Sequence, residues 1–369
     1  MKIYWLFLIL SFFICIWNEN HYREIWDGTR YRRQAYWGQA ILFFAVLIFF
    51  CGLRSGVADT GTYIAMFEEY PTSISQVNMD DIGKDKGFYI FSVLYKQIIS
   101  VDFHGWLFLI ALISGIALMI GLVKYSEYFG LSCYLLISNT MFTYFINGMR
   151  QFIVVTIFFW ASYMILQRKW KEYVILILLL STIHGSAIVL LLVYFMGNTK
   201  PWGRKMRTVI FLALIFGVFF DKLFPIFGDL LMETQYKGYV DYISTQGKGS
   251  SVIRLAIAAV PCALAYIGRR AVEEEHNQYI NFCINMSVIN FCLYIIATFS
   301  SGMVVGRLTT YFDIFNLVLL PWLLHHVFTE ASRKIVVLAC MGFYFIFFYF
   351  QMVLVWGLGY ESDILHLWI

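Results

Sequence analysis

Residues 103–123 of this chain read FHGWLFLIALISGIALMIGLV and contain no lysine, arginine, aspartate or glutamate. A helix needs about 20 mostly apolar residues to cross the hydrocarbon core of a bilayer. This stretch meets that requirement in length and composition, so it predicts a membrane-spanning helix. Similar apolar runs follow one another along most of the sequence.

The composition of the whole chain supports the same class of protein. Hydrophobic residues make up 60% of the chain, aromatic residues 20% and charged residues 14%, whereas a soluble domain carries about a quarter charged residues. We therefore predict an all-α polytopic integral membrane protein whose outer surface contacts the lipid bilayer. The formal net charge of +4 is small and gives no reason to expect a nucleic-acid partner.

The apolar runs predict about 10 full transmembrane helices in a single domain, residues 1–369. These runs, together with one that is assigned below to a re-entrant pair, are 2–17, 36–53, 103–123, 131–147, 151–167, 173–196, 208–220, 251–267, 279–299, 309–328 and 335–356. Two long polar loops, 54–102 and 221–250, are expected on the outer side. No small-residue cleavage site follows the first run, so we expect it to be a retained span rather than a signal peptide.

The basic loops predict the orientation, because lysine and arginine favour the cytoplasmic side. With the N-terminus outside, the basic loops 18–33 and 167–171 are cytoplasmic. A simple span at 173–196 would then place the basic loop 197–207 outside. We therefore hypothesise that 173–196 enters and leaves by the cytoplasmic face as a re-entrant helical pair, with His184 near its tip. The prediction is a multi-pass membrane protein with an extracytoplasmic N-terminus.

Three arginines border apolar runs, and in this topology they lie near the same outer face: Arg54, Arg150 and Arg307. An arginine at the centre of a span costs about 2.5–3.5 kcal/mol on insertion scales, so such residues usually face a bundle interior or a watery cavity. Guanidinium groups recognise phosphate through paired hydrogen bonds, so this cluster would suit a phosphate-bearing lipid. The alternatives are a snorkelling Arg150 in a polar turn and a structural pair between Arg307 and a carboxylate.

Polar and aromatic side chains beside these arginines complete the predicted binding set: Asn147, Gln151, Tyr63 and Tyr311. Two residues are candidates for a general base. Asp59 lies on one helical face with Tyr63 and either caps that helix or places a carboxylate near Arg54. His184 is either a hydrogen-bonded packing residue or a neutral imidazole that accepts a proton from a sugar hydroxyl.

The chain contains no DxD, HExxH, Walker A or GxGxxG sequence. We therefore expect no nucleotide-sugar donor site, no ATP site, no metal site and no cofactor. The seven cysteines lie in or beside apolar runs without a CxxC pair, a pattern that favours packing roles over zinc binding or disulfides.

Five segments, in this order, resemble the EpsG-family, Wzy-like polysaccharide polymerases. They are GLRSGVADTGTYIAMF at 52–67, DKGFYIFSVLYKQI at 85–98, NGMRQFIVVTIFFW at 147–160, IHGSAIVLLLVYF at 183–195 and GRLTTYFDIFNLVLLP at 306–321. The chain departs from the family pattern at two places. Asp85 and Lys86 replace a Glu-Pro pair, and Gly306 replaces a serine.

The resemblance implies a glycosyltransferase of the GT-C type that joins lipid-linked oligosaccharide repeat units at the outer face of the bacterial plasma membrane. The donor would be a glycan on undecaprenyl pyrophosphate. Arg150 and Arg307 would bind the pyrophosphate, and Arg54 would bind phosphate or glycan. Asp59 or His184 would act as base, or His184 would shape the cavity. A chain-length regulator and a flippase are the implied protein partners.

Two other functions remain open at this point. A flippase or other transporter of lipid-linked oligosaccharides could share the cationic cavity, although the chain shows no convincing internal repeat and its polar groups cluster at one face. A transferase resembling an O-antigen ligase would need the same donor site and a different acceptor. A membrane O-acyltransferase fits poorly, because its acyl donor arrives from the cytoplasm.

Overall fold

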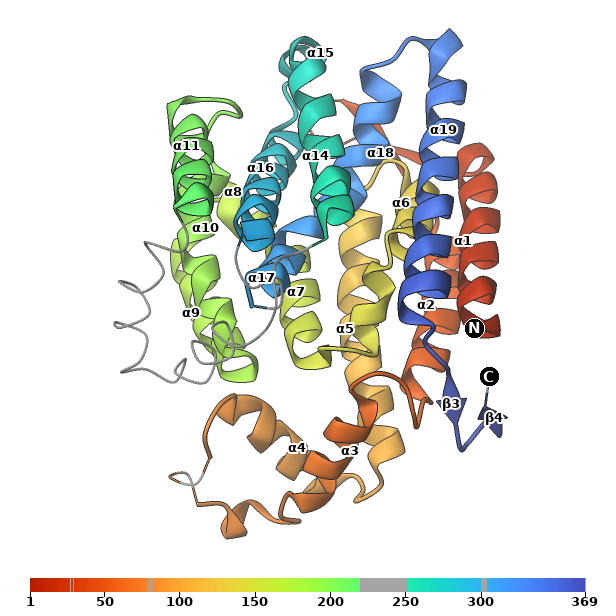
Figure 1. Ribbon diagram of the computed structural model, residues 1–369, viewed down its shortest axis with the longest axis vertical. Coiled ribbons are helices and arrows are strands. Elements are labelled where there is room, and N and C mark those ends of the chain that lie inside the picture. The colour runs from red at the N-terminus through yellow and green to blue at the C-terminus, as the bar shows by residue number, and fades with distance from the viewer. Residues whose placement is uncertain are drawn as a thin grey trace. The chain divides into compact units, whose positions relative to one another are not determined.

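The computed structural model describes residues 1–26, 28, 30–78, 80, 82–219, 251–299 and 304–368 (Figure 1). It divides into two compact units. The first unit comprises residues 1–163, 171–188 and 328–369, and the second comprises residues 164–170 and 189–327. The predicted single domain remains a prediction, and each unit is described separately. The described residues are helical apart from loops and two short β-hairpins, which confirms the predicted all-α class.

Five described helices are long and apolar enough to cross a membrane, or up to seven if each of two bent pairs counts as one span. The five are α1 (Lys2–Asn20), α5 (Phe103–Tyr125), the continuous pair α7 (Met149–Ala161) and α8 (Tyr163–Leu166), α16 (Gln278–Phe299), and α19 (Glu330–Phe348) with its π-helical extension η4 (Tyr349–Trp356). Shorter apolar helices fill other predicted runs. A polytopic membrane protein is therefore plausible, whereas ten crossings remain a prediction.

Helix α5 forms the centre of the first unit. It packs against α2 (Trp37–Gly52) and α7, while α1 packs against α6 (Phe129–Ser138). Small residues allow these helices to approach closely. A Cβ at Gly115 of α5 would lie 2.4 Å from Ile48 of α2, and one at Gly121 would lie 2.6 Å from the ring of Phe159 in α7.

The predicted outer loop 54–102 is largely folded. It contains α3 (Thr60–Glu69), the 3₁₀ turn η1 (Ile74–Gln76) and α4 (Lys86–Ile98), and Figure 1 shows α3 and α4 at one end of α5. An aromatic cluster joins these helices, with the ring of Phe67 stacked on Trp106 at a centroid distance of 4.6 Å. Met149 and Ile153 of α7 belong to the same cluster, so the segment is packed directly against the start of α7.

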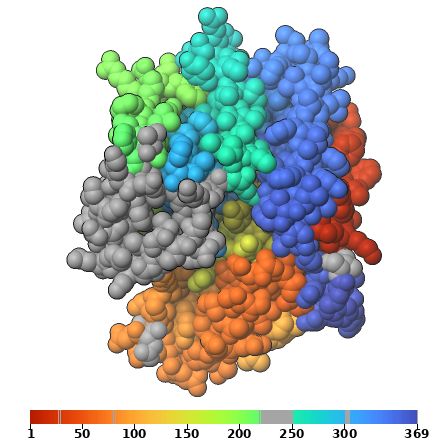
Figure 2. All heavy atoms as spheres, in the orientation of Figure 1, coloured from red at the N-terminus to blue at the C-terminus, as the bar shows by residue number. Residues whose placement is uncertain are grey.

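Short hairpins and turns complete the first unit. Strands β1 (Arg23–Trp26) and β2 (Tyr31–Gln34) pair antiparallel, and the turn η2 (Met141–Phe145) follows α6. The hairpin of β3 (Glu361–Ser362) and β4 (Leu367–Trp368) lies beside the segment after α2, as the dark blue and orange atoms of Figure 2 show. The backbone N–H of Ser55 donates to the carbonyl of Glu361 at 2.9 Å.

Helix α16 forms the centre of the second unit. It packs against α11 (Arg204–Val218), α14 (Val252–Ile267), α17 (Val304–Asp313) and α18 (Asn316–His326). Helix α14 continues after a 67° bend into α15 (Arg269–Glu275), and α17 and α18 meet at 52°. The predicted loop 221–250 lies outside the described residues.

The predicted re-entrant run contains a break in the α-helix. Helix α9 (Trp170–Ile183) ends as the N–H of His184 donates to the carbonyl of Leu180, and the chain continues as the 3₁₀ helix η3 (Gly185–Leu192) and α10 (Val193–Gly197). The break thus falls within the predicted STIHGSA segment. Re-entry from one membrane face remains a prediction, since helix geometry alone does not position the bilayer.

Candidate functional site

The carboxylate of Asp85 joins three segments of the first unit. Its Oδ2 lies 2.9 Å from Nη1 of Arg150 and 3.6 Å from Nδ1 of His184. Its Oδ1 accepts a hydrogen bond of 2.9 Å from the backbone N–H of Gly185. The start of α4, the start of α7 and the break after α9 therefore meet at one carboxylate.

Backbone geometry holds Asp85 at this junction. It is the residue before α4 and adopts a left-handed conformation, with φ of 58° and ψ of 45°, which costs an ordinary residue about 1–2 kcal/mol and is tolerated best by glycine, asparagine and aspartate. Two residues later, a Cβ at Gly87 would lie 2.1 Å from the hydroxyl oxygen of Thr182. This close approach sets the start of α4 against the end of α9.

Arg150 lies between this carboxylate and an aromatic wall. Its guanidinium carbon is 5.5 Å from the ring centre of Tyr63 and 5.7 Å from that of Phe88, distances at which a cation attracts an aromatic face. About a quarter of the Arg150 side chain, 26%, is exposed to solvent. Its Nε is buried and has no hydrogen-bond partner among the described residues, so Arg150 retains a hydrogen-bond donor beyond the one that engages Asp85.

The environment keeps Asp85 ionised. Burial alone would raise the pKa of its carboxyl group. The imidazole of His184, the N–H of Gly185 and the charge of Arg150 outweigh that effect and hold the pKa below its usual value. A carboxylate that is charged at neutral pH can both pair with a guanidinium and orient an imidazole.

A carboxylate facing Nδ1 favours the histidine tautomer that carries its proton on that nitrogen, which leaves Nε2 able to accept a proton. The 3.6 Å separation in this structure exceeds a hydrogen bond, and Nδ1 of His184 has no hydrogen-bond partner among the described residues. Catalytic hydrogen bonds are often long before the substrate is bound. The three side chains thus place a cation that could bind an anion beside a carboxylate and an imidazole.

Arg54 occupies a different environment in the same unit. Its side chain is fully buried. Nε donates to Oγ1 of Thr60 at 2.9 Å, Nη1 donates to the carbonyl of Cys51, and Nη2 lies 3.3 Å from the sulfur of Met149. These contacts join the end of α2 to the starts of α3 and α7, and they leave Arg54 with no exposed surface.

Asp59 does not pair with Arg54. It is the residue before α3, the predicted N-cap position, but its side chain makes no capping hydrogen bond. No ion pair links Asp59 to another residue in the described part of the chain. A carboxylate that does approach a predicted site arginine is Asp85, which pairs with Arg150 and which sequence reasoning left out of the site.

The remaining predicted site residues are distributed over both units. Tyr63 is buried beneath Arg150, Gln151 is buried in the first turn of α7, and Asn147 is exposed in the turn before it. Arg307 and Tyr311 lie in α17 of the second unit, where Arg307 is exposed and Tyr311 is fully buried. Arg150, His184 and Tyr63 are therefore the predicted residues that gather around Asp85, and a shared cavity with Arg307 remains a prediction.

One feature of the sequence could have identified Asp85 as a site residue. It opens the 85–98 segment, at the position where the family that this sequence resembles carries a Glu-Pro pair. Its partners lie 65 and about 100 positions away along the chain, so only the fold brings them together. Among the described residues, no group of three or more histidine, cysteine, aspartate or glutamate side chains is placed to hold a metal ion.

A sequence model of the EpsG family matches residues 39–362. The matched region includes Asp85, Arg150 and His184 together with all five motif segments. A comparison with curated proteins finds no match, and no solved structure matches the chain. Because the family match covers most of the sequence, the chain belongs to the EpsG family, which is associated with exopolysaccharide biosynthesis.

Proposed function

We propose that this protein polymerises undecaprenyl-pyrophosphate-linked oligosaccharide repeat units as a GT-C-type glycosyltransferase. The observation that carries the proposal is the contact of Asp85 with both Arg150 and His184. A guanidinium suits the pyrophosphate of the donor, and a carboxylate-oriented imidazole suits the acceptor hydroxyl. Membership of a family associated with exopolysaccharide biosynthesis supports the same reaction class.

In the proposed reaction, a hydroxyl oxygen of the acceptor repeat unit attacks the anomeric carbon of the donor glycan. The bond from that carbon to the pyrophosphate oxygen breaks, and the lipid pyrophosphate leaves with the bonding electron pair. Nε2 of His184 takes the hydroxyl proton and later releases it to solvent. Arg150 stabilises the negative charge that develops on the leaving group, a role that requires a cation already positioned in the site.

Because Asp85 lies beside both Arg150 and His184, binding of the donor affects the proposed base, His184. A pyrophosphate that engages Arg150 competes with Asp85 for the guanidinium. When Arg150 turns to the phosphate, Asp85 loses one cationic partner and interacts more strongly with His184. Asp85 thus orients the imidazole for the acceptor hydroxyl when the donor is bound. Arg54 has no exposed surface through which to contact a substrate and supports the position of Arg150 through Met149.

The proposal includes the predicted membrane arrangement. The N-terminus is extracytoplasmic, about ten segments cross the plasma membrane, and the Asp85 site faces the outer side, where a flippase delivers repeat units. A chain-length regulator is the second proposed protein partner.

The test is a polymerisation assay with purified protein in lipid nanodiscs and repeat units on undecaprenyl pyrophosphate. We expect a ladder of lengthened lipid-linked glycans without nucleotide sugar or added metal. Arg150→Ala should reduce the rate by roughly a hundredfold or more, because it removes transition-state stabilisation. Arg204→Ala, which removes an exposed arginine at the start of α11, is the matched control and should retain the ladder.

Three outcomes would contradict the proposal. An Arg150→Lys variant with full activity would exclude paired hydrogen bonding to phosphate, because lysine is a single point charge. Absence of any ladder with the correct repeat unit, combined with movement of that lipid across liposome bilayers, would favour the transporter. A product transferred once to an added acceptor would instead indicate ligase-like activity.

A further inference from the structure

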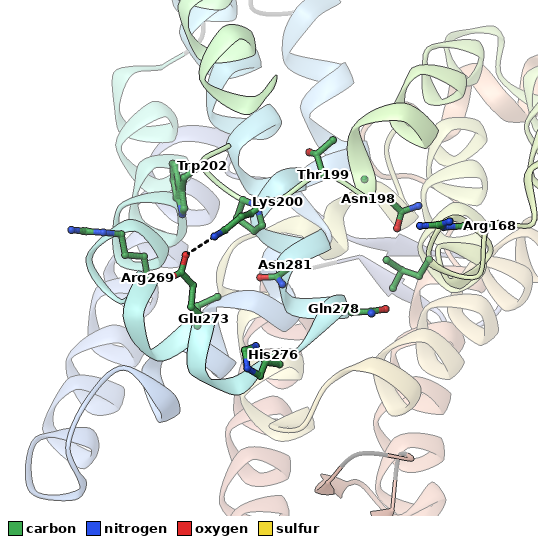
Figure 3. Close-up of a pocket in the computed structure, with 14 residues that line it drawn as sticks. Arg168, Asn198, Thr199, Lys200, Trp202, Arg269, Glu273, His276, Gln278 and Asn281 are labelled. Atoms are coloured by element: carbon green, nitrogen blue, oxygen red, sulfur yellow. Dashed lines mark ion pairs between the residues drawn. The ribbon is translucent and has the colours of Figure 1, made fainter. Parts of the chain in front are cut away.

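A separate polar cavity of about 630 Å³ lies entirely within the second unit (Figure 3). Its lining comes from the turn between α10 and α11, from α15, from the first turn of α16 and from the turn after α8. Because α16 is long and apolar enough to cross a membrane, a cavity at its end would lie near the membrane interface. None of the residues placed in the Asp85 site lines this cavity.

The cavity carries an excess of positive charge. Arg168, Lys200 and Arg269 line it, against one carboxylate, Glu273. Lys200 and Glu273 point toward one another and form an ion pair at 3.2 Å, as the dashed line in Figure 3 shows. Arg269 lies 4.8 Å above the ring of Tyr266. The guanidinium of Arg168 is exposed and makes no ion pair with any residue that the structure describes.

Two asparagine amide groups, one of them fully buried, hold the basic turn at 197–203 in place. The fully buried Asn285 donates from Nδ2 to the carbonyl of Thr199 at 2.7 Å, and Asn198 donates to the carbonyl of Ile165 at 2.7 Å. These bonds anchor the backbone beside Lys200 to α16 and to α8. The backbone of this part of the cavity wall is therefore held in place by hydrogen bonds to α16 and α8.

Three residues that line the cavity adopt left-handed backbone conformations although none is glycine. Their φ values are 56° for Arg168, 60° for Trp202 and 50° for His276. Such conformations cost about 1–3 kcal/mol each and tend to occur at binding or active sites. Gln278 and Asn281 add amide side chains to the same wall, and Figure 3 shows Asn281 between Lys200 and Gln278.

We propose that this cavity binds the phosphate group of an anionic membrane lipid, with Lys200 and Arg168 as the cationic ligands. Basic pockets between membrane helices recognise phosphate head groups, and tryptophan and tyrosine such as Trp202 and Tyr266 are enriched at the level of those head groups. The chemistry recognised is a phosphate ester, and its source is the bilayer. This assignment is independent of the proposed glycosyl transfer.

The experiment measures lipid retained by the full chain. Protein purified in mild detergent is mixed with phosphatidylglycerol or phosphatidylcholine, and native mass spectrometry records the bound fraction. We expect preferential retention of phosphatidylglycerol. Lys200→Gln and Arg168→Gln should each weaken that retention about fivefold, the effect of one basic residue near an anionic lipid. Lys205→Gln, which neutralises an exposed lysine outside the cavity, should retain the wild-type preference.

A gain-of-binding variant guards against misfolding as an explanation. Glu273→Gln removes the carboxylate that occupies Lys200, so phosphatidylglycerol should bind more tightly. Equal retention by the wild type, Lys200→Gln and Arg168→Gln would overturn the proposal, as would Glu273→Gln with no increase. Lipid retention is compared only between variants whose thermal unfolding temperatures match that of the wild type.

A second arm distinguishes the lipid from a soluble phosphate compound. Inorganic phosphate is added in the absence of anionic lipid, and the thermal unfolding temperature is followed. If phosphate stabilises the wild type but not Lys200→Gln, while phosphatidylglycerol shows no preference, the source is soluble and the lipid assignment is wrong. Stabilisation by phosphatidylglycerol but not by inorganic phosphate supports the lipid.

Discussion

Gly87 of α4 packs so closely on α9 that a Cβ at this position would lie 2.1 Å from the hydroxyl oxygen and 2.7 Å from the Cβ of Thr182. This contact lies two residues from Asp85. It fixes the distance between the start of α4 and the helix break that carries His184, and therefore fixes the geometry of the carboxylate.

Replacing Gly87 with alanine should separate α4 from α9. We expect a destabilisation of about 1–3 kcal/mol, the usual cost of forcing an extra methyl group into a packed interface, together with a lower polymerisation rate. Thermal unfolding and the glycan ladder measure the two effects. Gly61→Ala is the control, because a Cβ there meets nothing within 4 Å and alanine favours the helix. Equal stability of the two variants would show that the close contact is not required.

Asp85→Asn should reduce the polymerisation rate by roughly 10²–10⁴, the range associated with a positioned acid–base group. The amide keeps the shape of the carboxylate but neither pairs with the charge of Arg150 nor favours the required tautomer of His184. The two candidates for the base are Asp59 and His184. Comparing Asp59→Asn with Asp85→Asn decides between them. A larger loss in Asp59→Asn than in Asp85→Asn would return the base role to Asp59.

The lowered pKa of Asp85 predicts a pH dependence of stability. The folded protein binds the carboxyl proton less readily than the unfolded chain, so ionised Asp85 stabilises the fold above its unfolded pKa of about 4. That contribution is lost as the pH falls below this value toward the lower pKa of the folded state. Thermal unfolding of the wild type should therefore show an acid-dependent loss that is smaller in Asp85→Asn. Identical pH profiles would contradict the assignment.

Arg54→Lys should lower stability more than it lowers the activity of the folded fraction. Lysine keeps a positive charge but cannot reach Thr60, the Cys51 carbonyl and Met149 together as the planar guanidinium does. A buried group that loses its partners costs about 1–3 kcal/mol. Unfolding temperature and activity per folded molecule are compared. Normal stability with a large loss of activity would instead place Arg54 in substrate binding.

Most of the helices can be predicted from the sequence, because membrane spans and buried helices must both be apolar. Each predicted run within the described residues contains helix, and the break near His184 follows from polar residues and a glycine in an apolar run. The number of crossings is harder to predict. Helices such as α6 (Phe129–Ser138) are apolar because they are buried in the first unit, and composition alone does not separate burial in protein from burial in lipid.

The site is only partly predictable for a related reason. Arg150, Tyr63 and His184 stand out as polar groups in apolar surroundings. Asp85 lies in a polar stretch where an acidic residue is ordinary, and its role depends on a left-handed backbone and on partners far along the chain. The alternative in which Asp59 pairs with Arg54 is not observed, since the guanidinium contacts Thr60, Cys51 and Met149 instead.

The hairpin after η4 has a consequence for the order in which the protein matures. Tyr360 donates its hydroxyl proton to the carbonyl of Phe50, 310 positions earlier in the chain, and Ser362 donates to the carbonyl of Leu53. During synthesis, α2 is made long before these partners exist. The carbonyl groups at the end of α2, next to Arg54, therefore gain these two partners only after residues 360–362 have been made, so a nascent chain that stops earlier lacks both hydrogen bonds.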